Sequence, residues 1–164
     1  NYIRSQMQYT TVTFTVTSSN AGTAITANKA IGVFSYSVTV PEGLWKINAM
    51  NMTTVGQMAT ANVKVYCMKG DVNIPTLSEG ATIDIPHAAL NNFKGCYKFA
   101  TANFFYGNTN GFHIGYPNVN GTIGTTQLQA QFRTQIIFCA IYDGSFTPTA
   151  NEVYVFNVEM QRLN

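Results

Sequence analysis

The sequence has 164 residues, the length of one domain, and a chain of this size can bury a substantial core without metal or disulfide support. Charged residues make up only 10% of it, far below the usual quarter, while 46% are hydrophobic. Much of the remainder is Thr, Asn, Ser, Gln and Gly, a balance that disfavours helices and favours strands and turns. A monomer with so few charged residues tends to associate. We therefore expect apolar surface to be buried between identical subunits.

The net charge of +2 comes from basic residues that are scattered along the chain rather than gathered in a run. They are Arg4, Lys29, Lys46, Lys64, Lys69, Lys94, Lys98, Arg133 and Arg162. A shell protein that packages a genome usually carries an arginine-rich arm, and this scatter excludes such an arm within the sequence. The chain begins at Asn1 rather than Met, which is typical of a processed or excised piece, so an arm or a stalk upstream is compatible with it.

The cysteines, Cys67, Cys96 and Cys139, lie far apart, and an odd number cannot all pair. Each stands in an apolar strand context, and no Cys/His spacing typical of a metal site occurs, so we interpret them as buried free thiols. Free thiols favour assembly in a reducing compartment such as the cytoplasm. We expect neither a signal peptide nor a membrane-spanning segment in this sequence.

The predicted elements begin with a strand over residues 8–17, where Val12, Phe14 and Val16 alternate with threonines. This alternation predicts an antiparallel strand with one solvent-exposed face. Residues 18–28, rich in Ser, Asn, Gly and Thr, predict a loop.

Residues 31–52 predict two strands on either side of a corner. One face is predicted to carry Phe34, Tyr36, Val38 and Val40 before the corner and Trp45, Ile47 and Ala49 after it, with Lys46, Asn48 and Met50 on the other face. At the corner Pro41 has no N–H to donate and Gly43 tolerates a positive φ, so the backbone must turn there. We expect Trp45 to anchor the core, its indole N–H donating to a backbone carbonyl.

The same stretch carries a resemblance to a known family. The residues are Gly32-Val33-Phe34-Ser35-Tyr36-Ser37-Val38 followed by Val40-Pro41-Glu42-Gly43-Leu44-Trp45. They resemble a signature of the complement globular-head and tumour-necrosis-factor-like jelly rolls, and are similar to a strand corner in the heads of phage and viral fibres. The match covers little more than residues 32–45. It implies a jelly-roll fold and a homotrimer.

Further elements follow in order. We predict a strand over residues 61–68, a turn at residues 69–71 and a short strand over residues 81–85. Residues 86–93 are the one plausible helical turn, and the run over residues 97–106 is rich in aromatic side chains.

Residues 130–142 predict a strand that is apolar on both faces in its second half. One face must pack on the core, so the other, with Ile137, Cys139 and Ile141, is a hypothetical subunit interface. Residues 153–163 predict the closing strand. About ten strands at hairpin-like spacing predict an all-β, antiparallel β-sandwich of jelly-roll type, with residues 1–164 forming a single domain.

The sequence gives little support to catalysis. His87 and His113 have no Ser or Cys partner in any nucleophile signature, and the few acidic residues fall mostly in turns. No phosphate-binding loop and no metal-ligand cluster occurs, so we predict a protein that is not an enzyme, without cofactor, metal or catalytic residues.

The segment over residues 107–124, dense in Gly, Asn and Tyr, is the best candidate for ligand or receptor binding. Rigid amphipathic rings supply contact area there, and small amides supply adaptable hydrogen bonds. The hypothetical binding residues are Tyr106, Asn108, Asn110, Phe112, His113, Tyr116 and Asn118. An ordinary polar loop with one or two buried rings is an equal alternative. Lys94 and Lys98 predict a solvated strand edge, with an anionic glycan contact as the alternative.

These features favour a non-enzymatic structural protein of a virus particle, located at the virion surface. Within that class we favour the homotrimeric receptor-binding head of a fibre or spike that contacts a host glycan or protein. The alternative is a jelly-roll capsid protein that forms the shell of a small icosahedral virus. A secreted complement-head-like or lectin-like module is a third class, disfavoured by the odd cysteine count. Nothing in the segment indicates nucleic acid or membrane insertion.

Overall fold

The computed structural model describes residues 8–18, 23–55, 62–70, 72–101, 104–106, 113–115, 118–119, 128–148 and 152–163. The strands are β1 (Tyr9–Thr17), β2 (Ala30–Val55), β3 (Val63–Lys69), β4 (Phe93–Phe99), β5 (Phe104–Tyr106), β6 (His113–Gly115), β7 (Asn118–Val119), β8 (Leu128–Tyr142) and β9 (Val153–Arg162), and the helix is α1 (His87–Leu90). The all-β prediction with at most one short helix near residues 86–93 is confirmed. Residues 81–85, predicted as a strand, make only one isolated bridge, between Thr82 and Lys29.

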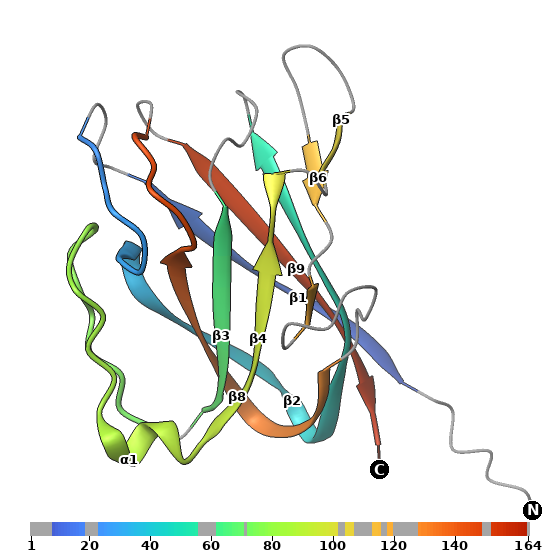
Figure 1. Ribbon diagram of the computed structural model, residues 1–164. Helices are drawn as coiled ribbons and strands as arrows, with labels where there is room; N and C mark the ends of the chain where they lie inside the picture. The colour runs from blue at the N-terminus through green and yellow to red at the C-terminus, as the bar shows by residue number, and fades with distance from the viewer. Residues whose placement is uncertain are drawn as a thin grey trace, which may run out of the picture.

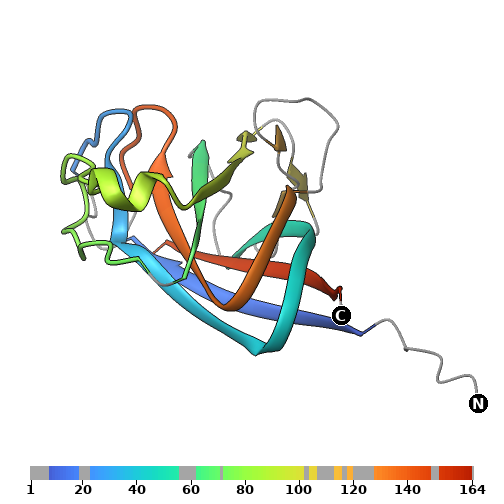
Figure 2. The same cartoon turned by 90° about the horizontal axis from the view of Figure 1, so that it is seen from below.

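The described strands form one antiparallel sheet that folds into two layers (Figures 1 and 2). One layer holds β1, β9, the second half of β2 and β6, and the other holds the first half of β2, β8, β3 and β4. If the halves of β2 are counted separately, these eight strands run 1-8-3-6 in one layer and 2-7-4-5 in the other. This is the strand order of a jelly roll, as predicted.

The two layers are joined because β2 runs through the corner as one continuous, bent strand. The sequence predicts two strands there, and the structure keeps strand hydrogen bonds through the corner with a register shift between Thr39 and Leu44. A second shift lies between Ile47 and Ala49 and reverses the alternation, so that Met50 is buried and Ala49 is not. The predicted face for these two residues was therefore wrong, because a bulge adds one residue to the period of two.

Another bulge changes the face of Phe34. The pairing of β2 with β8 shifts between Ala30 and Ser35, and Gly32 and Phe34 both have positive φ, 60° and 71°. Phe34 therefore packs on the outside of its layer, whereas Val38 and Val40 pack between the layers as predicted.

Trp45 anchors the corner as the sequence predicts. Its side chain is buried, and its Nε1 donates a hydrogen bond of 2.8 Å to the carbonyl of Pro41. The guanidinium of Arg162 lies 6.0 Å from the ring centre, in the range of a cation–π contact. Gly43 has a φ of 141°, and a Cβ there would lie 2.7 Å from Arg162 Nε. The geometry of the corner therefore explains both Gly43 and Trp45.

Apolar side chains fill two separate clusters, one between the layers and one outside them. The inner cluster includes stacked rings, with Phe14 lying 4.6 Å from Phe138 and 4.8 Å from Phe156 between ring centres. The outer cluster forms where residues 72–90 cross the outer face of β2, β8 and β3. We call these residues the covering segment.

Replacing Trp45 should destabilise the fold in steps. We expect Trp45→Phe to lower the free energy of unfolding by about 1–2 kcal/mol, because the hydrogen bond to Pro41 and part of the ring contacts are lost. Trp45→Ala should cost about 3–5 kcal/mol through the cavity that it leaves. Urea unfolding followed by circular dichroism measures both, with Leu163→Ala as an exposed control that changes stability little.

Candidate functional site

The structure describes three of the seven predicted ligand-binding residues, and only their backbone. Tyr106 in β5 pairs with His113 in β6, at the end of a hairpin beside the second half of β2. Asn118 in β7 pairs with Lys98 in β4. Asn108, Asn110, Phe112 and Tyr116 lie outside the described residues. The described strands therefore bring Tyr106 and His113 together and place Asn118 at a different edge.

The predicted subunit-interface residues have partners within the chain. Ile137, Cys139 and Ile141 belong to the outer cluster, where Phe34, Met68 and the covering segment surround them. Ile137 is 7% exposed, and the other two are fully buried. An interface at these residues stays a prediction, but the uncovered apolar face that motivated it is covered by residues 72–90 of the same chain.

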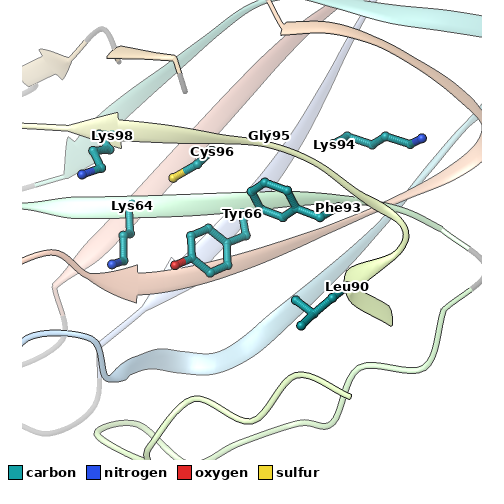
Figure 3. A pocket seen from close by; sticks show the side chains of 8 residues that line it. All are labelled: Lys64, Tyr66, Leu90, Phe93, Lys94, Gly95, Cys96 and Lys98. Carbon is teal, nitrogen blue, oxygen red and sulfur yellow. The ribbon is translucent and has the colours of Figure 1, made fainter. Parts of the chain in front are cut away.

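A groove of about 750 Å³ lies beside the covering segment, on the outer face of β3 and β4 (Figure 3). Its walls come from Lys64, Tyr66, Leu90, Phe93, Lys94, Gly95, Cys96 and Lys98. Tyr66 pairs with Cys96, and Lys64 pairs with Lys98, so alternate residues of the two strands face the same side. We call this hollow the β3–β4 groove.

One end of the β3–β4 groove is apolar. The rings of Phe93 and Tyr66 meet edge to face, with their centres 5.5 Å apart. Phe93 is 41% exposed and Leu90 is 46% exposed, although both are large apolar side chains. Such a pair of rings is held in one arrangement, which makes it a rigid contact surface.

The other end of the β3–β4 groove is cationic. Nζ of Lys64 lies 3.7 Å from Oδ1 of Asp143, and Nζ of Lys98 lies 3.9 Å from Oδ2 of the same carboxylate. Lys64 also donates to Oδ1 of Asn28 at 2.5 Å and lies 5.8 Å from the ring centre of Tyr66. In Figure 3, Lys64, Lys98 and the Tyr66 hydroxyl gather at this end.

The thiol of Cys96 is not activated by its lysine neighbours. Burial raises its pKa from 9.0 to about 11, and this outweighs the lowering effect of Lys64 and Lys98. The thiol therefore stays protonated at neutral pH, when a reactive cysteine would be a thiolate. Among the residues that the structure describes, no three His, Cys, Asp or Glu side chains are placed to hold a metal ion. No helix in this part of the chain is long and apolar enough to cross a membrane.

No protein-family model and no curated protein sequence matches this chain. Among solved structures, it is similar to VP2 of the infectious bursal disease virus subviral particle, with 12% identity and a TM-score of 0.35, over 96% of this chain and 33% of that one. A chain of Mud crab tombus-like virus has 13% identity and a TM-score of 0.26, over 100% of this chain and 96% of that one. The chain thus spans about a third of the VP2 chain. At such TM-scores these similarities carry no argument, and the strand order alone defines the class, a jelly-roll β-sandwich.

Sequence reasoning found part of the groove. Lys94 and Lys98 are predicted from the sequence as a solvated strand edge flanking Cys96 and Tyr97, with an anionic glycan contact as the alternative. Lys64 and Tyr66 were missed, because the register of β3 against β4 is set by the fold. The available signal was the alternation of Lys64 and Tyr66 with buried Val63 and Val65.

Truncating a residue under the covering segment tests the interface hypothesis. We expect Ile141→Ala to lower the free energy of unfolding by about 2–4 kcal/mol, because it leaves a cavity inside the chain. Urea unfolding at two protein concentrations checks this. If the loss in free energy of unfolding depends on protein concentration, Ile141 lies in a subunit interface.

The buried thiols should make the protein sensitive to alkali. Burial raises the pKa of Cys96 to about 11 and that of Cys139 to about 12, so the unfolded chain loses these protons first as pH rises above 9.0. Stability should be fully present below that pH and fall between about pH 9 and pH 12. Melting temperatures from about pH 7 to pH 11 measure the fall, which Cys96→Ser should reduce. A flat profile in the parent protein would contradict the assignment.

Proposed function

We infer that this chain is a non-enzymatic structural protein of a virus particle, exposed at the virion surface. The observation that carries the proposal is the jelly-roll strand order, an architecture that viral coat and attachment proteins share with lectins and cupins. The resemblance of residues 32–45 to trimeric heads favours the homotrimeric head of a fibre or spike as its form. Three free cysteines suit assembly in a reducing cytoplasm.

The edge of the sheet at β1 supports assembly from copies of the chain. Among the described strands, β1 pairs with β9 alone, and no other described strand lies along its outer edge. Its sequence, YTTVTFTVT, has no charged residue and no proline, the common devices that prevent pairing between sheet edges. Its nine pairs with β9 run without a register shift, so no bulge twists this edge away. An edge of this kind is suited to contact a second copy.

The hypothetical receptor contacts form the second part of the proposal. Tyr106 and His113 lie opposite each other in the β5–β6 hairpin, so the segment between them starts and ends at one place on the fold. We propose that residues 107–124 contact a host glycan or protein, and that threefold display turns individually weak contacts into avidity.

A capsid shell subunit is the second candidate, favoured by the spread of exposed apolar side chains. Tyr9 lies on β1, Leu90 and Phe93 lie around α1, and Phe105 lies on β5. These places are far apart on the fold (Figure 1). A subunit with several neighbours would bury all of them, whereas a threefold ring needs only two complementary patches on each subunit.

The size of the native assembly tests the proposal. Light scattering on the purified chain should give a homotrimer for the fibre head, or a particle of dozens of copies for the shell. Thr13→Lys, which adds a charge to the β1 edge, should shift either assembly toward monomers. Thr76→Lys is a control with the same change at an exposed position of the covering segment. A stable monomer at high concentration in the parent protein would overturn both forms.

The binding role of residues 107–124 has its own test. On a glycan array, or with a purified receptor, Tyr116→Ala should reduce binding about tenfold because a rigid aromatic contact is lost. Light scattering confirms that the variant keeps the assembly state of the parent. Undiminished binding by Tyr116→Ala removes the segment as the site.

A further inference from the structure

We propose that the β3–β4 groove binds an acidic sugar at the end of a glycan, with the carboxylate of the sugar on Lys98, beside Lys64. The inference rests on the proposed attachment function and deepens it, since it names a ligand class and gives it a place on the fold. It concerns a surface that lies apart from the β5–β6 hairpin and is lined by described side chains.

The two ends of the groove fit a ligand that is itself two-sided. Lys64, Lys98 and the Tyr66 hydroxyl supply hydrogen-bond donors at one end, and Phe93 and Leu90 supply exposed apolar surface at the other (Figure 3). A sugar acid carries a carboxylate on a ring whose C–H groups form an apolar face. Binding sites for small ligands commonly combine an apolar lining with a few placed polar groups in this way.

The spacing of the lysines already suits one carboxylate. In the free chain both ammonium groups lie within 3.9 Å of an oxygen of Asp143. The side chain of Lys98 is 47% exposed, and an ion pair of this kind contributes little to stability. Lys98 can therefore turn from Asp143 to a ligand carboxylate at small cost. Lys64, whose side chain is only 12% exposed and is held by Asp143 and Asn28, keeps its place and adds a nearby positive charge.

The charge of the groove is unusual for this protein. Lys64 and Lys98 share one aspartate, which leaves a charge of +1 at that end of the groove, and Lys94 lies beyond Phe93 at the other end (Figure 3). In a chain with so few charges, a concentration of one sign marks the place where an anion is attracted.

The apolar end of the groove is rigid enough to recognise the ring of a sugar. Phe93 is fixed edge to face against Tyr66, so it presents its exposed surface without losing side-chain freedom on binding. Aromatic faces carry partial negative charge and attract the C–H groups of a sugar. The pairing of Lys98 with Asn118 places one of the sequence-predicted binding residues at the next strand position beside the groove.

Saturation-transfer NMR on the protein in its native assembly, with sialyllactose as the probe and lactose as the neutral control, tests the proposal. Sialyllactose should give a signal and lactose none. Lys98→Gln should weaken binding about tenfold, because it removes a charge-assisted hydrogen bond. Lys46→Gln, the same change at the distant corner of β2, should leave binding unchanged.

Asp143→Asn should change the affinity for sialyllactose in the opposite direction. It removes the competing carboxylate, so we expect sialyllactose to bind about threefold to tenfold more tightly. A merely structural role of the lysines would not produce this gain. Raising the salt concentration should weaken binding in the parent and in Asp143→Asn.

Several outcomes would overturn the inference. Equal signals from lactose and sialyllactose, or equal binding by Lys98→Gln and Lys46→Gln, would exclude a carboxylate site in the groove. Binding of sulfated lactose with no binding of sialyllactose would replace the carboxylate with a sulfate ester. Binding of an acidic peptide alone would replace the sugar with a protein partner. If the native assembly is confirmed and no sugar binds, the groove proposal fails while the structural role stands.

Discussion

The bend in β2 is the constraint on which the rest of the structure depends. Strand β2 pairs with β8 between Ala30 and Ile47 and with β9 between Trp45 and Val55, so one continuous strand belongs to both layers. The two layers cannot separate without breaking the pairing around the corner. Trp45 and Arg162 fill the corner, and Gly43 allows them to approach the backbone. The inner cluster, with its stack of Phe14, Phe138 and Phe156, forms because this bend faces the layers toward each other.

Alternation along the sequence was sufficient to predict most strands, and it failed where the backbone has bulges. Val12, Phe14 and Val16 were placed correctly because β1 pairs with β9 without a shift. Phe34 and Met50 were placed on the wrong faces because bulges in β2 change which side chain points inward. The position of a bulge depends on how distant strands pair, so it is difficult to predict from local sequence.

The site residues that local sequence predicts likewise differ from those that depend on the pairing of distant strands. Lys94 and Lys98 were recognised as a pair because they flank Cys96 and Tyr97 at a predicted strand edge, and both line the β3–β4 groove. Lys64 and Tyr66 join them through a register that connects residues more than thirty positions away in the chain. The predicted interface at Ile137, Cys139 and Ile141 assumed that a second apolar face needs a second subunit. The covering segment, broken by prolines and without regular strands, supplies that partner within the chain.

The covered outer face changes how a chain with so few charges can assemble. Because residues 72–90 cover the apolar face of β8, we expect contacts between copies to use sheet edges and element ends as well. The edge at β1 suits backbone pairing with a neighbour, and the exposed Phe105 in β5 suits a contact that buries a separate small patch, whereas Leu90 and Phe93 near α1 belong to the groove. An assembly of this kind leaves the broad face of β3 and β4 open, which is where the cationic groove lies. Association through the β1 edge and ligand binding in the groove can therefore occur together, since these two contacts depend on different surfaces of one jelly roll.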